Sequence, residues 1–289
     1  MPELPEVEVV KKSLQTKIVN LIIKKVNIND SNLRYKVKKE KFSKLLGKRI
    51  NSVKRRSKFL IFEFENNFFM LVHLGMTGKF FFINKEKKKF KTSFYYDFNN
   101  EKDKKYDRVI FHFKGNQRLI YNDVRKFGFF KLYNKNDYFK NLHLRNLGPE
   151  PLSKTWNIDY FRQYIHGRNR SIKSILMDQK FVSGLGNIYV NEVLFKSNIN
   201  PYRKVDKLKN FEIDKIIKNT KKILIKSINV GGSSIKDFSS DDGKKGSFQQ
   251  YFKVYGRNGK ICSNTDCNTT IIRSKISNRS TFICKSCQK

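Results

Sequence analysis

The sequence predicts an α+β protein: a helix and a β-sandwich or barrel come first, a helical segment follows, and a small zinc-binding hairpin ends the chain. Three observations lead to this prediction. Short β-type runs follow an amphipathic start, helical periodicity follows a Pro- and Gly-containing stretch, and all four cysteines lie near the C-terminus. With 289 residues, the chain is long enough for two domains of ordinary size.

The first half of the chain begins with a helix and continues with strands. Val7, Val10 and Leu14 recur at helical spacing, which predicts an amphipathic helix over 6–18. The next hundred residues hold short runs rich in Phe, Tyr, Ile and Val, separated by polar turns, as is typical of a sandwich or barrel. The predicted strands are 59–64, 68–72, 79–83, 93–98, 108–113, 118–121 and 129–133. The basic segment 85–91 is predicted to be a solvated loop.

The second half is predicted to be helical. The segment 146–154, with two prolines and a glycine, is predicted to be a linker. A long Gly- and Ser-rich loop is predicted over 231–246, and a loop of this length is usually functional or disordered. The predicted helices are 157–166, 171–178, 187–197 and 208–229.

The cysteines form the most specific local pattern. Cys262-x4-Cys267-x16-Cys284-x2-Cys287 places two close pairs about one hairpin apart. Four thiolates around Zn²⁺ require this layout, and no ligand position is left open, so we predict one structural Zn²⁺. A segment this short cannot build a core alone, so the metal is expected to supply folding energy.

The charge of the chain indicates a polyanionic partner. Lys and Arg number 62 against 25 Asp and Glu, a net charge of +37, while 38% of the residues are apolar. That apolar content fills real cores, and nucleic acid is the commonest partner of such a basic protein. The alternative is codon bias, because the many Lys, Asn, Ile and Phe residues also indicate an AT-rich genome, which raises the Lys content of any protein. No apolar run approaches the ~20 residues of a membrane span, and no secretory signal is seen, so a cytoplasmic, nucleoid-associated location is predicted.

The opening MPELPEVEVV suggests amine chemistry. Removal of Met1 would leave Pro2 as a secondary amine, and an α-amino group has a pKa near ~8 against ~10.4 for lysine. Such an amine can attack a sugar C1′ and form an iminium, with Glu3 and Glu6 available for proton transfer. The alternative is structural, because Pro and Glu are favoured in the first turn of any helix.

Further motifs occur in one order along the chain. They are MPELPEVE, KFL at 58–60, HLGMTG at 73–78, DVRKFG at 123–128, LGPEPL at 147–152, SGLGNIYVNEVLF at 183–195, FQQYFKVYGR at 248–257 and the terminal cysteines. Together they closely resemble formamidopyrimidine-DNA glycosylase, the bacterial repair enzyme for oxidised bases, over residues 1–288. The resemblance implies a β-sandwich, a helix–two-turns–helix element and a zinc hairpin, with DNA in a basic cleft between them.

The resemblance also implies domain boundaries. They are an N-terminal catalytic β-sandwich domain over 1–135, a linker over 136–153, a helical DNA-binding domain with the lesion loop over 154–248, and a zinc finger over 249–289. The loop 231–246 with Tyr251 matches the region that closes over the flipped base.

The resemblance assigns catalytic roles to five residues. Pro2 matches the family's nucleophile, Glu3 its acid partner and Glu6 the carboxylate that supports them. Lys58 matches a lysine that assists proton transfer and holds phosphate, and Arg279 an arginine that grips phosphate.

A set of DNA-binding residues is implied as well: His73, Met76, Tyr106, Arg125, Lys126, Phe127, Arg168 and Asn187. Met76, Arg125 and Phe127 match the trio that enters the duplex when the damaged nucleotide is flipped out. An apolar wedge fills the vacated space and an arginine can pair with the abandoned cytosine. Tyr106 is a departure, because the family usually has histidine there, and C-x4-C replaces the usual C-x2-C.

The function that the resemblance implies is a bifunctional DNA glycosylase and AP lyase. It would excise formamidopyrimidines and 8-oxoguanine from double-stranded DNA through an N-terminal proline Schiff base, followed by β,δ-elimination, and act as a monomer without a redox cofactor or catalytic metal. Three alternatives stay open. They are an endonuclease VIII type, which usually opens MPEGPE where this chain has Leu4, a non-catalytic DNA-binding module, and a basic zinc-ribbon protein of ribosomal type.

Overall fold

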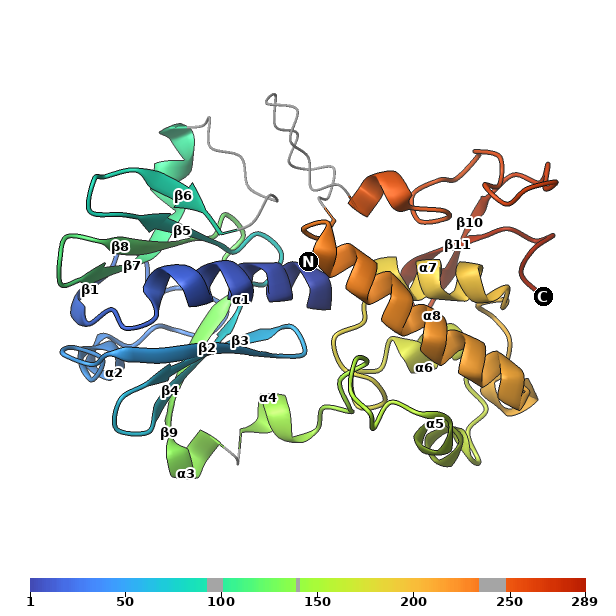
Figure 1. Cartoon of the computed structure of the whole chain (residues 1–289), viewed down its shortest axis with the longest axis horizontal. Helices are drawn as coiled ribbons and strands as arrows, with labels where there is room; N and C mark the ends of the chain where they lie inside the picture. The colour runs from blue at the N-terminus through green and yellow to red at the C-terminus, as the bar shows by residue number, and fades with distance from the viewer. Residues whose placement is uncertain (93–100, 139–140, 234–247) are drawn as a thin grey trace. The chain divides into compact units, whose positions relative to one another are not determined.

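The computed structural model describes residues 1–92, 101–138, 141–233 and 248–289 (Figure 1). The chain forms two compact units. Unit 1 comprises Met1–Arg145 and Gly231–Ser247, and unit 2 comprises Asn146–Val230 and Phe248–Lys289. In the described part of the chain, no helix has the length and apolar character needed to cross a membrane.

Unit 1 is a sandwich of two antiparallel sheets with the helix α1 (Leu4–Ile18) packed into its core. The five-stranded sheet has the order β1-β7-β8-β5-β6 and the four-stranded sheet the order β2-β3-β4-β9. The strands are β1 (Ile23–Ile28), β2 (Ile50–Arg56), β3 (Phe59–Phe64), β4 (Phe68–His73), β5 (Lys79–Ile83), β6 (Lys89–Lys91), β7 (Asp107–Phe113), β8 (Arg118–Asn122) and β9 (Phe129–Asn134). Short helices are α2 (Lys39–Ser43), η1 (Glu101–Tyr106), α3 (Lys135–Tyr138) and α4 (Leu142–Arg145).

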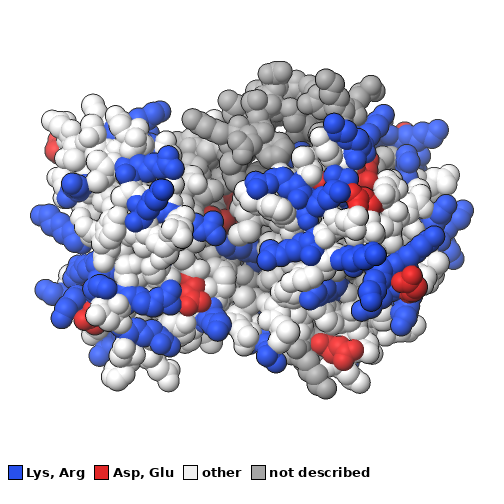
Figure 2. All heavy atoms as spheres, turned by 180° about the vertical axis from the view of Figure 1, so that it is seen from behind, with Lys and Arg blue, Asp and Glu red and all other residues white. Residues whose placement is uncertain are grey.

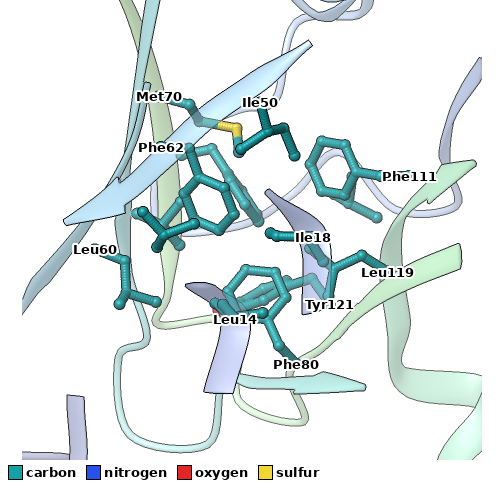
Figure 3. Packing of buried hydrophobic residues seen from close by; sticks show 14 of the residues in the cluster. Leu14, Ile18, Ile50, Leu60, Phe62, Met70, Phe80, Phe111, Leu119 and Tyr121 are labelled. Atoms are coloured by element: carbon teal, nitrogen blue, oxygen red, sulfur yellow. The ribbon is translucent and has the colours of Figure 1, made fainter. Parts of the chain in front are cut away.

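The core of unit 1 is built from α1 and both sheets (Figure 3). Leu14 of α1, Phe62 of β3 and Phe80 of β5 are each fully buried, and the two phenylalanine rings lie 5.9 Å apart. Burying aromatic rings of this size is the largest favourable term available to a small domain. The Phe-rich runs therefore form the sandwich that the sequence predicts.

Six of the seven predicted strands are present, and 93–98 lies outside the described residues. Sequence analysis missed β1, β2 and β6, and β6 falls inside the loop predicted over 85–91. Strand β1 alternates little in hydrophobicity because Lys24 and Lys25 are both exposed beside the buried Ile23. A strand with one solvated face and several lysines lacks the period-two signal on which the prediction rests.

Unit 2 is helical and ends in a hairpin. Its elements are α5 (Ile158–Ile165), α6 (Ile172–Leu176), α7 (Asn187–Ser197), η2 (Val205–Lys207), α8 (Asn210–Asn229), η3 (Phe248–Tyr251), β10 (Ile272–Ile276) and β11 (Arg279–Ile283). The four predicted helices are confirmed. Helix α8 buries an isoleucine stripe, and Trp156 packs fully buried with its ring 5.1 Å from that of Phe181. The predicted linker 146–154 contains no helix or strand.

Candidate functional site

The N-terminal segment is buried and anchored. Pro2 and Glu3 are both buried, and α1 begins at the next residue. The Glu6 carboxylate, 3% exposed, accepts the backbone N–H of Glu3 at 2.9 Å on one oxygen. Its other oxygen accepts the N–H and the hydroxyl of Ser233 at 2.8 and 2.9 Å. Glu6 therefore fastens residue 3 to residue 233 within unit 1.

Lys58 lies at the turn between β2 and β3 and is only 7% exposed. Arg55 braces this turn, because its Nη1 donates to the Ser57 carbonyl at 2.9 Å and its Nε donates to the Glu8 carboxylate at 2.7 Å. A buried lysine on a braced turn has a fixed position, which a proton-transfer group requires.

The α-amino group lies near these charges. Burial lowers the pKa of the Met1 α-amino group below its ordinary 8.0. The positive charges of Lys58 and Arg125 lower this pKa further, while Glu3 and Glu6 act in the opposite direction. A larger fraction of the amine is consequently neutral at pH 7, and a neutral amine is a nucleophile.

His73 ends β4 in the same unit. Its Nδ1 accepts the N–H of Gly75 at 3.0 Å, so in the neutral ring the proton resides on Nε2. The ring stacks on Phe129 at 5.5 Å between centroids. Burial, followed by the positive charges of Lys58 and Arg34, lowers the pKa of His73 to about 4. At neutral pH this side chain is therefore an uncharged hydrogen-bond donor.

Three predicted residues project from two turns of unit 1. Met76 is 38% exposed and Phe127 is 44% exposed, which is unusual for large apolar side chains. Arg125 is also exposed, and its guanidinium carbon lies 4.6 Å from the centre of the Phe127 ring. Exposed apolar tips beside an arginine suit insertion between bases.

Two further predicted residues lie near these turns. Tyr106 is half-buried, and its carbonyl accepts the N–H of Asp123 at 3.0 Å. Lys126 has a left-handed backbone, with φ 59°, and its ammonium lies 2.7 Å from a carboxylate oxygen of Asp30. Arg108 binds the same oxygen at 3.0 Å, so the acid is shared between two cations.

Unit 2 gathers Asn187, Arg279 and a lysine that sequence analysis did not select. The Asn187 side chain donates to the Ser280 carbonyl at 2.9 Å. Lys173, 1% exposed, donates to the same carbonyl and to the Thr281 hydroxyl, both at 2.8 Å. Burial first, and the charge of Arg279 second, lower the pKa of Lys173 to about 7. The Asn187 and Lys173 side chains thus both bind Ser280, the residue that follows Arg279.

The remaining predicted residues are placed as follows. Arg168 is exposed beyond α5, with its guanidinium carbon 4.4 Å from the centre of the Tyr164 ring. Tyr251, 41% exposed, lies under the Lys226 ammonium at 3.8 Å. Of the predicted loop over 231–246, residues 234–246 lie outside the described part of the structure.

The four cysteines form a cluster that could hold a metal ion. The sulfur atoms of Cys262, Cys267, Cys284 and Cys287 all lie within 4.8 Å of one another. Two of the sulfur–sulfur distances are 3.8 and 3.6 Å. A tetrahedral Zn²⁺ with Zn–S bonds of about 2.3 Å would place its sulfurs about 3.8 Å apart, so the cluster fits this ion. The four sulfur atoms therefore lie close together despite the wide C-x4-C spacing of the first pair.

Sequence analysis also missed two polar anchors on α7. Asn191 is buried, and its side-chain amide oxygen Oδ1 accepts the N–H of Phe282 in β11 at 2.8 Å. Glu192, 4% exposed, accepts three backbone N–H groups of residues 253–255 at 2.8–3.0 Å. Polar residues inside the otherwise apolar helix NIYVNEVLF were the available signal, because buried polar groups need partners.

The surface carries a strong positive charge. On the face shown in Figure 2, Lys and Arg side chains far outnumber Asp and Glu, in line with 62 against 25 in the whole chain. Such a surface attracts polyanions over distances of about a Debye length.

Comparison with known proteins places these features in one family. The model of the formamidopyrimidine-DNA glycosylase N-terminal domain matches residues 1–130, and that of the formamidopyrimidine-DNA glycosylase H2TH domain matches residues 147–239. The formamidopyrimidine-DNA glycosylase of Rickettsia bellii is 40% identical over all of both chains. That of Rickettsia felis is 39% identical over all of this chain and 98% of its own.

Solved structures agree. The Lactococcus lactis Fpg in complex with DNA containing an abasic site has a TM-score of 0.84 and 33% identity, over 99% of each chain. The same organism's enzyme with N7-benzyl-Fapy-dG DNA has a TM-score of 0.84 and 34% identity over both whole chains. The sandwich, the helical segment and the cysteine hairpin are thus the family's fold. This chain belongs to the formamidopyrimidine-DNA glycosylase family.

Proposed function

We propose that this DNA glycosylase removes oxidised purines, namely formamidopyrimidines and 8-oxoguanine, from double-stranded DNA and then cleaves the strand at the abasic site. The observation that carries the proposal is the buried N-terminal segment. There burial lowers the pKa of the α-amino group that Met1 carries, and the charges of Glu3, Glu6 and Lys58 act on the same group, so the chain begins beside the carboxylates and the lysine that the proposal uses. Solved relatives carry N7-benzyl-Fapy-dG and carbocyclic 8-oxo-G DNA, which supports this class of substrate.

The chemistry begins once Met1 has been removed. The Pro2 nitrogen then forms a bond to C1′ of the damaged nucleotide, while the bond from C1′ to the base breaks and the base leaves with a proton. The amine loses its own proton, the bond from C1′ to the ring oxygen O4′ then breaks as O4′ takes up a proton, and an iminium between nitrogen and C1′ remains. Loss of a C2′ proton expels the 3′ phosphate, and a second elimination expels the 5′ phosphate. Glu3 and Lys58, both buried beside the amine, are the proposed proton-transfer groups.

DNA contacts are assigned by the same proposal. Neutral His73 donates to a phosphate, and Asn187 and Arg279 grip the backbone from unit 2, with Arg279 as the fourth residue of the catalytic set. Met76, Arg125 and Phe127 fill the space that the flipped nucleotide leaves. The remaining proposed contacts are Tyr106, Lys126 and Arg168.

The cysteine cluster is proposed to hold one structural Zn²⁺. Cys262, Cys267, Cys284 and Cys287 would be its ligands, and the ion would supply folding energy for a hairpin too small to have its own core. We also propose that the enzyme acts as a monomer on the nucleoid, in the cytoplasm. Light scattering of the free protein tests the monomer.

Borohydride trapping tests the catalytic proposal. The protein is incubated with a duplex containing 8-oxoguanine opposite cytosine, reduced, digested with protease and analysed by mass spectrometry. We expect a covalent adduct on residue 2, and we expect Pro2→Gly to lose most of it while the control Pro5→Gly keeps it. An adduct on a lysine, or equal trapping by Pro2→Gly, would remove Pro2 from its role.

A second duplex tests the substrate class. Thymine glycol replaces 8-oxoguanine in the same sequence, and release of the two bases is compared at equal enzyme. We expect faster release of 8-oxoguanine. Faster release of thymine glycol would assign the protein to the endonuclease VIII type instead.

A further inference from the structure

The two turns that carry the exposed trio meet at their bases. One turn, residues 74–78, follows β4, and the other, residues 123–128, connects β8 to β9. Met76 and Phe127 project from them, whereas Asp123, the first residue of the second turn, is fully buried. Each turn thus has an exposed tip on a buried base.

The Asp123 carboxylate connects the two turns. One oxygen accepts the Thr77 hydroxyl at 2.5 Å, and the other accepts the N–H of Gly128 at 2.9 Å and the hydroxyl of Tyr121 at 3.2 Å. The Thr77 oxygen in turn accepts the N–H of Arg125 at 3.0 Å. A hydrogen-bond relay therefore runs from the Arg125 backbone through Thr77 to Asp123 and crosses from one turn to the other.

The backbones of the two turns are also in direct contact. A Cβ atom on Gly75 would lie 2.5 Å from the backbone nitrogen of Gly128 and from the carbonyl carbon of Phe127. A Cβ on Gly128 would lie 1.7 Å from the Tyr121 hydroxyl oxygen. No side chain fits between the turns, so their spacing is set by backbone contact and by the hydrogen bonds of Asp123.

Asp123 forms no salt bridge within the described part of the chain, and only neutral donors satisfy its carboxylate. The Arg108 guanidinium donates to the Asp123 backbone carbonyl at 2.9 Å, while the buried carboxylate itself depends on its three hydrogen bonds, each of which is costly to lose. The arrangement suits a wedge that must hold its shape, because separating stacked bases costs a few kcal/mol per step.

We propose that Asp123 is a positioning residue that locks the two turns together through Thr77, so that Met76, Arg125 and Phe127 enter the duplex as one rigid body. The inference rests on the proposed function, since it concerns how the trio acts on DNA. It adds Asp123 and Thr77 to the residues that control base extrusion, although neither contacts the reacting atoms.

The test uses Thr77→Val, which keeps the shape of the side chain but removes both relay bonds. Thr77→Ser keeps the hydroxyl and serves as the rescue variant. Thr92→Val is the control, because Thr92 is a second threonine of unit 1 with a hydrogen-bonded hydroxyl, which donates to the Phe80 carbonyl at 2.8 Å, and it lies outside the two turns. Melting temperatures of all variants establish that each one folds.

Two reactions separate positioning from general damage. Release of 8-oxoguanine from a duplex needs the wedge, whereas borohydride trapping on an abasic site in a single strand has no opposing stack to open. We expect Thr77→Val to slow duplex release about 10- to 100-fold, the loss typical of a misplaced group. Trapping on the single strand should stay within about twofold, and Thr77→Ser and Thr92→Val should behave as the parent.

A fluorescence measurement detects insertion of the trio directly. The duplex carries an uncleavable tetrahydrofuran site, with 2-aminopurine beside the base opposite that site. Binding of the parent protein should unstack the 2-aminopurine and raise its emission, and Thr77→Val should raise the emission less. Equal losses in both reactions, or no loss on the duplex, would overturn the positioning role. A parent protein that neither releases 8-oxoguanine nor traps would instead refute the proposed function.

Discussion

The two compact units hold their proposed DNA-contacting residues by different means. Unit 1 carries Met76 and Phe127 on turns that rest on a sandwich whose core includes the fully buried Phe62 and Phe80. Unit 2 carries Arg279 on a two-stranded hairpin, which is fixed by a few polar contacts from α6 and α7, by four cysteines and by a small apolar cluster that includes Phe195 and Phe282. The large core of unit 1 depends little on any single contact, whereas the small cluster under the hairpin leaves more of the stability to each polar contact and to the cysteines.

Removing the metal should produce the largest difference in stability between the two units. Structural Zn²⁺ contributes apparent free energies of about 10–16 kcal/mol in isolated fingers, so a strong chelator should unfold the hairpin. We expect amide hydrogen exchange in β10 and β11 to become fast while β3 to β5 stay protected, and DNA affinity to fall more than about 100-fold. Added Zn²⁺ should restore both. Unchanged protection of the hairpin in the chelated protein would contradict the metal-dependent half of the comparison.

A core truncation should affect unit 1 instead. Phe80→Ala removes a fully buried ring, and phenylalanine truncations in cores cost about 3–5 kcal/mol. Urea unfolding of the variant should show this loss, whereas Phe211→Ala, at a side chain that is 66% exposed, should change stability by less than about 0.5 kcal/mol. If both variants lost equal stability, the Phe-rich core would not be the main source of the stability of unit 1.

A single anchor of the hairpin can be removed next. Asn191→Ala leaves the N–H of Phe282 without its acceptor, a loss of about 1–3 kcal/mol for a buried group. Hydrogen exchange should accelerate in 279–283 more than in α8. Asn219→Ala, a partly buried amide that bonds Lys196 and Ser197, is the control and should leave the hairpin unchanged.

The smallest expected effect is a pH dependence in unit 1. His73 has a folded pKa of about 4, below its ordinary 6.5, so the unfolded chain binds the proton more readily between these values. The contribution of neutral His73 to the free energy of unfolding is therefore fully present above pH 6.5 and is lost as pH falls toward 4. Urea unfolding at pH 7 and pH 5 should show the parent losing about 1–2 kcal/mol more than His73→Asn. An equal loss in both proteins would show that other groups carry the pH dependence.

Sequence analysis predicted the fold well where local patterns were strong. The runs FLIFEF and KFFFI became β3 and β5, and the stripe from Ile213 to Leu224 became α8. Strand β2, INSVKRR, was missed because its lysine and two arginines outnumber its two buried positions, Ile50 and Val53, and interrupt the apolar pattern. A strand is recognised in sequence by the regular spacing of its apolar residues, and charged residues among them weaken this pattern.

Some residues of the candidate site could likewise be predicted from local patterns, and others could not. Cysteine spacing and the opening motif were visible in the sequence because those residues lie close together along the chain. The buried polar contacts were not, since Asp123 meets Thr77 across 46 residues and Asn191 meets Phe282 across 91. Such partners become neighbours only through tertiary folding, which leaves no local pattern to read.

The crowding around the Tyr121 hydroxyl constrains how this patch can evolve. A Cβ atom on Gly128 would lie 1.7 Å from that oxygen, and one on Gly78 would lie 2.4 Å from it and 2.2 Å from the Leu74 carbonyl oxygen, so neither glycine can gain a side chain beside this tyrosine. Yet a smaller residue at 121 would take a hydrogen-bond donor from Asp123. Each single substitution at these three positions is therefore unfavourable, so we expect the three residues to persist together among homologues while exposed lysines vary.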